Sequence, residues 1–260
     1  MSTYSIIIAL LLVSIGACTT DDEPTVRAEK AYVYYLWGQS NMAGITKSSD
    51  WSDIDAEQEI YDGSMFKKQS PEDFSGSPYT NSGIELQLGG YLKERHTDGD
   101  VFFVKRAIGS TSVAWHWNIV TSTSGRGAEL IAYKEDIVNA HQLLEELGYT
   151  IEPQLLLSFI GESDSVSPTS ATNFEDNYLA TIASIQETIG QDVPVVAYDI
   201  DISEEAQLSF PLPHVDEVRA QYGKLQQRGV RVIATDDVER ASDGIHVTRA
   251  GYRQLQEKGI

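Results

Sequence analysis

The sequence predicts an α/β protein: a three-layer α/β/α sandwich around a doubly wound sheet of five parallel strands. Three observations support this prediction. Short apolar runs rich in β-branched and aromatic residues alternate with longer amphipathic runs. Several short runs are apolar on both faces, as is typical of parallel strands that helices cover on both sides. The chain of 260 residues can bury one large core, and no internal repeat or second boundary divides it.

Five segments are expected to be strands, because most are rich in residues that favour extended backbone. In chain order they are residues 32–37, 101–107, 154–160, 193–200 and 230–234. Helices are expected between them and after the last, where apolar residues recur near the helical period. These are residues 83–95, 128–147, 173–189, 215–228 and 248–258. The alternation predicts right-handed crossovers between parallel strands.

The N-terminal residues are expected to form a signal and a tether. Residues 1–17 are expected to be a lipoprotein signal peptide, because the apolar run IIIALLLVSI is too short to span a bilayer and IGAC at its end resembles a lipobox. Cys18 would then carry the lipid, and it is the only cysteine, so it has no internal disulfide partner. The alternative is a plain secretory signal, since MSTYS lacks Lys and Arg.

Residues 18–30 are expected to be an acidic tether and residues 31–260 one folded domain. The acidic run resembles surface-export signals. The expected location is therefore extracytoplasmic, lipid-anchored to a bacterial membrane, at the outer membrane; whether this is the cell surface, and which leaflet and face hold the anchor, is left open. The formal net charge of −20 argues against nucleic acid as a partner, and membrane contact is expected only through Cys18. No metal-ligand spacing or phosphate-binding loop occurs, so no metal and no cofactor are expected.

Polar residues follow four of the expected strands. They are GQSN at 38–41, IGSTS at 108–112, GESD at 161–164 and, beyond a short loop, DGIH at 243–246. Because the carboxyl ends of parallel strands meet at one edge of a sheet, these residues are expected to converge. The sequence therefore predicts a polar site at that edge that contains a serine, a histidine and acids.

Acyl transfer needs these residue types. Ser40 is the candidate nucleophile, and His246 is the candidate base that takes its proton. Asp243 lies three residues before His246, so its carboxylate can reach Nδ1 while Nε2 faces outward. The backbone N–H groups of Ser40 and Gly109 are the candidate oxyanion hole.

The four motifs resemble those of SGNH-type esterases, which have a flavodoxin-like fold. More narrowly, they resemble the sialate O-acetylesterase and carbohydrate esterase family 6 group, which includes acetyl xylan esterases. The resemblance implies a carbohydrate O-acetylesterase that works through a serine acyl-enzyme, with an acetylated carbohydrate as substrate. It assigns Ser40, His246 and Asp243 to the triad and Gly109 to the oxyanion hole.

The resemblance also covers supporting residues. Gln39 and Asn41 flank Ser40, while Glu162 and Asp164 match an acidic block of the family. Glu162 is interpreted either as a buried acid with a raised pKa or as a partner for Arg106. The motif departs at Ile160, where the family usually has Gln; loss of a donor near the oxyanion costs a factor of about 10²–10³ in rate.

Trp115 and Trp117 follow the oxyanion loop and are candidate sugar-stacking residues, with core packing as the alternative for each. Two other functions remain open. One is a carbohydrate-binding surface lipoprotein whose hydrolase site is weak or inactive, which the Ile160 departure allows. The other is an esterase for lipids or other small esters, which fits the triad. Which glycan carries the acetyl group, xylan, sialic acid or another, is also left open.

Overall fold

The computed structural model describes residues 29–44, 59–68, 82–119 and 125–259. The expected signal peptide, Cys18 and most of the expected tether lie outside this part of the chain. Lys30, expected to end the tether, instead begins the first strand. Within the described residues, no helix has the length and apolar character needed to cross a bilayer.

In the part of the chain that the structure describes, the sheet has seven strands in the order β3-β2-β4-β1-β5-β6-β7. Five neighbouring strands run parallel and match the five expected segments; they are β4, β1, β5, β6 and β7. Two short strands were not expected: β2 pairs parallel with β4, and β3 pairs antiparallel with β2. Neither segment, EIY or FKK, has more than two successive apolar residues, so the expected strand count was too low. The bounds are β1 (Lys30–Gly38), β2 (Glu59–Tyr61), β3 (Phe66–Lys68), β4 (Gly99–Ala107), β5 (Thr150–Phe159), β6 (Val195–Tyr198) and β7 (Arg231–Ile233).

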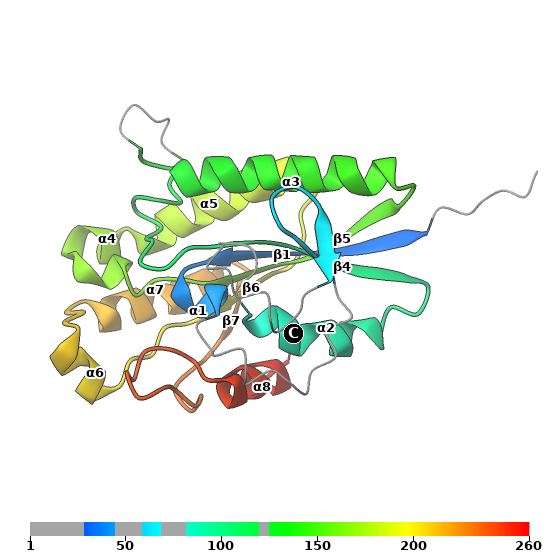
Figure 1. Cartoon of the computed structure of the whole chain (residues 1–260). Coiled ribbons are helices and arrows are strands. Elements are labelled where there is room, and N and C mark those ends of the chain that lie inside the picture. Colours follow the sequence, from blue (N-terminus) through cyan, green and yellow to red (C-terminus); the bar gives the residue numbers. More distant parts are fainter. Residues whose placement is uncertain (1–28, 45–58, 69–81, 120–124, 260) are drawn as a thin grey trace, which may run out of the picture.

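Helices cover both faces of the sheet, which confirms the three-layer prediction. Alternate residues of β1 enter different cores: Tyr35 and Trp37 pack with α3, α5 and α7, whereas Tyr34 and Leu36 pack with α2 and α8. Figure 1 shows α3 and α5 on one side of the sheet and α2 and α8 on the other. The helices are α1 (Ser40–Ala43), α2 (Ile84–Lys93), α3 (Ala128–Glu146), α4 (Pro168–Thr172), α5 (Phe174–Ile189), α6 (Glu204–Ser209), α7 (Val215–Gln227) and α8 (Arg249–Glu257), with a 3₁₀ turn η2 at Asp164–Val166.

The strand order places a ligand site at a defined edge. Across the sheet, the five matching parallel strands lie in the order β4-β1-β5-β6-β7. If these five are numbered 1 to 5 along the chain, the order is 2-1-3-4-5, which is the flavodoxin-like order. The switch point of this order lies between β1 and β5. Connections that leave the carboxyl ends of these two strands diverge there, and this is where open α/β sheets bind ligands.

The end of β1 is fixed by close backbone contact. A Cβ on Gly38 would lie 2.2 Å from the Phe159 carbonyl oxygen, and φ of Gly38 is 155°, so a side chain is excluded twice over. The Gln39 amide donates to that same carbonyl at 3.0 Å, and the Ile108 amide donates to the Gly38 carbonyl at 3.2 Å. The residue after this turn is Ser40, which is therefore held at the switch point.

Candidate active site

Ser40 begins α1, a four-residue helical turn directly after β1. The amides of Met42 and Ala43 donate to the Gln39 carbonyl at 2.9 and 2.7 Å, which tightens the turn. Ser40 is 7% exposed, so it is largely buried at this edge of the sheet. Gly109 faces it: a Cβ built on Gly109 would lie 3.9 Å from the Ser40 Cβ. The structure thus brings together the end of β1 and the loop after β4.

A buried ion pair lies beneath α1. The Lys105 ammonium, on β4, lies 2.7 Å from the Glu85 carboxylate of α2, and both side chains are 0% exposed. Lys105 also donates to the Ala43 carbonyl at 2.9 Å. Burial lowers the pKa of Lys105, and the neighbouring Glu85 charge opposes that shift. The end of α1 is therefore anchored to both β4 and α2.

His246 lies on a closed loop before α8. An isolated bridge joins Arg240 to Val247, and the Ala241 amide donates to the His246 carbonyl at 2.7 Å. Inside the loop, Asp243 Oδ2 lies 2.6 Å from His246 Nδ1. Asp243 Oδ1 accepts the amides of Ile245 and His246, each at 2.9 Å, as in an Asx turn. The spacing DGIH therefore folds as the sequence predicts, with the carboxylate on Nδ1.

The same hydrogen bonds set the charge of Asp243. Partial burial acts to raise its pKa, but the bonds from the His246 amide, the His246 ring and the Ile245 amide outweigh it. The pKa of Asp243 is thereby lowered below its ordinary value. A carboxylate that stays ionised favours a proton on the adjacent Nδ1, which leaves Nε2 free to act as a base.

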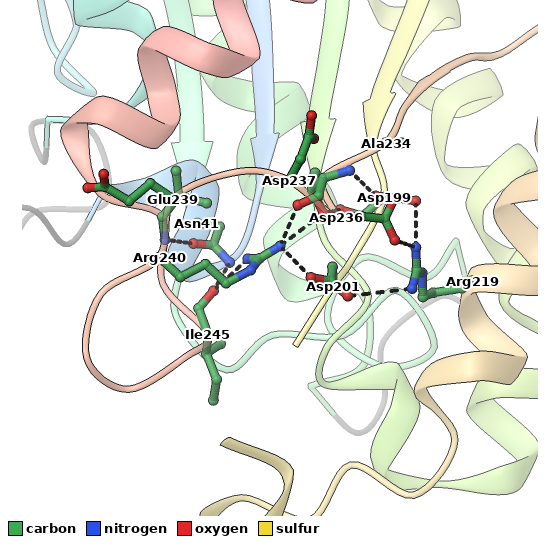
Figure 2. A network of polar contacts seen from close by, with 12 residues as sticks. Asn41, Asp199, Asp201, Arg219, Ala234, Asp236, Asp237, Glu239, Arg240 and Ile245 are labelled. Atoms are coloured by element: carbon green, nitrogen blue, oxygen red, sulfur yellow. Dashed lines mark hydrogen bonds and ion pairs between the residues drawn. The ribbon is translucent and has the colours of Figure 1, made fainter. Parts of the chain in front are cut away.

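Asn41 joins the serine turn to the histidine loop. Its Nδ2 donates to the Ile245 carbonyl at 3.2 Å, and its Oδ1 accepts the Val247 amide at 2.9 Å. Figure 2 shows Asn41 and Ile245 side by side at this contact. The residue next to Ser40 thus holds both neighbours of His246. Among the described residues, no direct hydrogen bond joins the Ser40 hydroxyl to the His246 ring; such bonds commonly form only once substrate is bound.

Glu162 lies beside this junction. It is 5% exposed, and its Oε1 accepts the second N–H of Asn41 at 2.8 Å. Burial raises the pKa of Glu162, although the Asn41 bond and the His246 charge act in the opposite direction. Arg106 pairs instead with Glu129 at 2.9 Å and Asp136 at 3.3 Å. Of the two interpretations of Glu162, the buried acid is therefore the one that the structure has.

Asp164 holds the loop that contains Gly109. Its carboxylate is 0% exposed and accepts the amides of Val113 and Ala114, each at 2.9 Å. Burial raises the pKa of Asp164 to about 7, against the effect of these two hydrogen bonds. Ser110, next to Gly109, has φ of 62°, a left-handed conformation that is costly for a residue with a side chain. Asp164 thus helps to fix a strained loop.

Gln39 and Ile160 are positioned by the core on which the site rests. Gln39 is 3% exposed, and its Oε1 accepts the Ser163 amide at 3.3 Å. Ile160 is 0% exposed and packs in the core cluster with α5 and α7, while the Tyr222 hydroxyl donates to its carbonyl. The side chain at the position of the family glutamine is therefore a core side chain.

The two candidate tryptophans differ. Trp117 is 0% exposed; its Nε1 donates to Thr111 Oγ1 at 3.0 Å and its ring lies 5.2 Å from that of Trp37. Trp117 is thus a core residue, and its expected role in stacking on sugars is wrong. Trp115 is 48% exposed and lines a pocket of about 550 Å³. The polar residues of this pocket are Arg126, Ser167, Thr169, Ser170, Asn173, Asp176 and Asn177.

Two residues of the site carry no sequence signal. The Tyr252 hydroxyl on α8 donates to the Asn41 carbonyl at 2.6 Å, and Arg240 donates to the Ile245 carbonyl at 3.1 Å. Neither belongs to a motif, and a tyrosine on an amphipathic helix reads as core. Among the described residues, no cluster of three His, Cys, Asp or Glu side chains is arranged to hold a metal ion.

The fold and this edge define a class. A flavodoxin-like sheet that carries a Gly-Gln-Ser-Asn turn after β1 and an Asp-x-x-His loop before the last helix is an SGNH-type hydrolase. Residues 30–258 match the family described as carbohydrate esterase, sialic acid-specific acetylesterase. Since the match spans most of the chain, the protein belongs to this family of esterases. No curated protein matches the chain.

Solved structures share the fold. A protein from Arabidopsis thaliana has a TM-score of 0.66 at 17% identity, covering 87% of this chain and 94% of that one. NanS has a TM-score of 0.60 at 11% identity, covering 88% and 94%. A carbohydrate acetylesterase from Xanthomonas citri has a TM-score of 0.56 at 14% identity, covering 87% of this chain but 54% of its own. At these identities the likeness concerns the fold alone.

Proposed function

We propose that the protein removes acetyl groups from a saccharide through an acyl-enzyme on Ser40, with His246 as base and Asp243 as its acidic partner. One observation carries the proposal. Asn41, adjacent to Ser40, bonds to both residues that flank His246, while Asp243 bonds to His246 Nδ1 at 2.6 Å. This arrangement ties the turn that carries Ser40 to the loop that carries an imidazole oriented by Asp243, and so supports Ser40 as an activated nucleophile.

The reaction has two stages. First, His246 Nε2 takes the Ser40 proton while Ser40 Oγ attacks the acetyl carbonyl; the bond to the sugar oxygen then breaks, and His246 returns the proton to that oxygen. Second, water attacks the acetyl-enzyme with His246 again as base, and acetate leaves as Ser40 Oγ regains its proton. Asp243 stabilises the imidazolium in both stages.

The oxyanion is assigned to the amides of Ser40 and Gly109. Within the described part of the chain, neither amide donates to another protein group, so both are available to a ligand. The near contact of Gly109 with Ser40 and the fixation of its loop by Asp164 support a preorganised pair of donors. With Ile160 in the core, no glutamine side chain from that position adds a third donor, and we expect turnover to be correspondingly slow.

The substrate is assigned to saccharides on two grounds. The family is one of carbohydrate esterases, and the Trp115 pocket combines an exposed indole with planar polar side chains suited to sugar hydroxyls. The pocket is tied to the oxyanion loop, because Arg126 donates to the Ala114 carbonyl at 3.2 and 3.0 Å and the Ala114 amide donates to Asp164. We propose this pocket as a subsite for the sugar.

The test of the nucleophile is Ser40→Ala. Hydrolysis of p-nitrophenyl acetate should fall by about 10⁴, and a fluorophosphonate probe should label wild-type protein at Ser40 but not the variant, as read by mass spectrometry. Saccharide binding without labelling would instead indicate the inactive carbohydrate-binding alternative. Unchanged hydrolysis in Ser40→Ala would reject the assignment.

The test of the subsite is Trp115→Ala. Loss of a stacking surface should raise KM for an acetylated saccharide by about 5–10-fold, since tenfold corresponds to about 1.4 kcal/mol. KM for p-nitrophenyl acetate, which has no sugar, should not change. Acetate release from acetylated xylo-oligosaccharides and from acetylated sialic acid would then assign the glycan. An equal effect of the variant on both ester types would reject the subsite.

We also propose that Cys18 carries a lipid and anchors the enzyme to the outer membrane. The support is the apolar run that ends in IGAC and the acidic segment after it. Cys18→Ser should move the protein from the membrane fraction to the soluble fraction. Wild-type protein recovered without bound lipid would reject the anchor.

A further inference from the structure

We propose that Arg240 is a positioning residue for the reaction: its guanidinium holds the peptide that precedes His246, and Asp201 helps to orient the guanidinium. The inference rests on the proposed role of His246 as base. Arg240 lies six residues before His246 on the loop that the Arg240–Val247 bridge closes. Among the described residues, its hydrogen bonds reach neither Ser40 nor the triad side chains, so it would act through the backbone.

The Ile245 carbonyl receives two donors. Arg240 Nη1 donates to it at 3.1 Å, and Asn41 Nδ2 donates to it at 3.2 Å. Figure 2 shows the Arg240 and Asn41 side chains meeting at this carbonyl. Because the peptide that follows Ile245 leads into His246, the two donors fix the direction in which the imidazole leaves the backbone. One donor comes from the nucleophile turn and the other from the histidine loop itself.

The second arm of the guanidinium reaches the ends of two strands. Nη2 donates to the Thr235 carbonyl at 3.0 Å, to Thr235 Oγ1 at 3.1 Å and to Asp201 at 3.4 Å. Thr235 follows β7 and Asp201 follows β6. The Arg240 side chain is 9% exposed. The loop that carries the base is therefore tied to the sheet by one largely desolvated cation.

The geometry requires arginine. A planar guanidinium with fixed, divergent donors can meet the Ile245 carbonyl on one side and Thr235 and Asp201 on the other. An ammonium on a flexible stem is a compact charge and cannot hold both sides at once. Replacement by lysine should therefore keep the charge near Asp201 but weaken the hold on the loop.

Asp201 is itself shared with a second arginine, which offers a matched control. Arg219 of α7 lies 3.4 Å from Asp201 and 3.7 Å from Asp199, and it also pairs with Asp236 (Figure 2). Arg219 thus belongs to the same network and contacts the same acid, but within the described residues it bonds to acidic side chains and not to the histidine loop. Its loss should disturb the network without releasing Ile245.

Solvent can reach the Arg240 site. A pocket of about 440 Å³ is lined by Arg240 together with Asp243, Gly244, Ser203 and Phe210. If the side chain is truncated, a free guanidinium ion can enter from this pocket and take the vacated place between the Ile245 carbonyl and Asp201. This makes chemical rescue a direct measure of the interaction.

The experiment compares Arg240→Ala with Arg219→Ala in the full chain. For Arg240→Ala, kcat on p-nitrophenyl acetate should fall by about 10², because misplacement of a catalytic group by roughly 1 Å costs that much, while KM stays unchanged. Millimolar guanidinium, far below the molar range that unfolds proteins, should restore part of kcat. Arg219→Ala should keep wild-type kcat and show no rescue.

Three results would overturn the inference. These are wild-type kcat in Arg240→Ala, a fall in kcat that guanidinium does not relieve, or equal losses in both variants. If Arg240→Ala does not fold, Arg240→Lys decides: a fall in kcat at unchanged KM supports the role, and unchanged kcat rejects it. Ser40→Ala and His246→Ala, measured alongside, separate the two proposals, because activity in those variants would reject the triad itself.

Discussion

The side-chain oxygen of Asn41 accepts a hydrogen bond of 2.9 Å from the backbone amide of Val247, 206 residues farther along the chain. The same side chain donates to Ile245, on the other side of His246. The turn that presents Ser40 and the loop that presents His246 are therefore one mechanical unit, and their separation does not depend on the intervening chain alone. The effect of changes at Asn41 follows from this.

Asn41→Ala should lower kcat by about 10² with little change in KM, because the variant removes the acceptor of the Val247 amide and one of the two donors to the Ile245 carbonyl, which loosens the geometry of the base. Kinetics on p-nitrophenyl acetate would measure this. Gln221→Ala is a suitable control, since Gln221 is also a buried amide (6% exposed) but lies on α7. A kcat loss no larger than that of the control would contradict the role of Asn41.

Asp243→Asn should lower kcat by about 10³–10⁴ while the protein stays folded. An asparagine oxygen can still accept the amides of Ile245 and His246, but its NH₂ group would face Nδ1 and favour the wrong tautomer. Steady-state kinetics together with thermal unfolding would separate chemistry from stability. A loss below tenfold would show that the acid is dispensable.

The raised pKa of Asp164 predicts that the stability of the protein depends on pH. Its folded pKa of about 7 lies above the ordinary carboxyl value of about 3.9, so the folded state holds a proton that the unfolded state releases. The contribution of Asp164 to the free energy of unfolding is therefore present in full below pH ~4 and is lost as pH rises through ~7.

The asparagine of Asp164→Asn does not titrate, so the free energy of unfolding of this variant lacks the pH dependence that Asp164 contributes. The stability advantage of wild-type protein over the variant should therefore shrink by about 2 kcal/mol between pH 5 and pH 7. Urea unfolding of both proteins at the two pH values measures the difference. A constant or growing difference with rising pH would contradict a raised pKa.

Lys105→Met should destabilise the protein by about 3–5 kcal/mol, because it leaves the buried Glu85 carboxylate without its cation. The double variant Lys105→Met with Glu85→Leu should recover most of that loss, since it removes the charge as well. Urea unfolding of the single and double variants would measure both effects. Equal losses in the two would argue against the ion pair as the cause.

Much of the fold follows from periodicity. The runs at 32–37 and 101–107 are long and apolar on both faces, and they are β1 and β4, the central strands of the sheet. The strand expected at 193–200 is β6, which ends at Tyr198. It begins two residues later than expected because Pro194 has no amide to donate to a ladder. Local patterns did not predict the strands β2 and β3 or the short helices α4 and α6, which have only three to six residues each.

The motifs predicted which residues of the site gather, but not what holds them. Asp243 and His246 are three apart, and local turn geometry alone brings them together. Trp117 has the same residue type as Trp115 and lies two positions away, yet one is buried and the other exposed, because burial depends on the packing of α3 and α5. Arg240 and Tyr252 bond to the backbone carbonyls of Ile245 and Asn41. Every residue has a backbone carbonyl, so no residue type in the sequence indicates these partners.

Among the strands that the structure describes, the outermost ones, β3 and β7, have three residues each. An outer strand exposes backbone donors and acceptors that another chain can pair with, and the hazard grows with its length and flatness. β3 also carries two lysines, Lys67 and Lys68, which oppose such pairing. The short outer strands of this sheet thus discourage the addition of strands from other chains and growth into fibres.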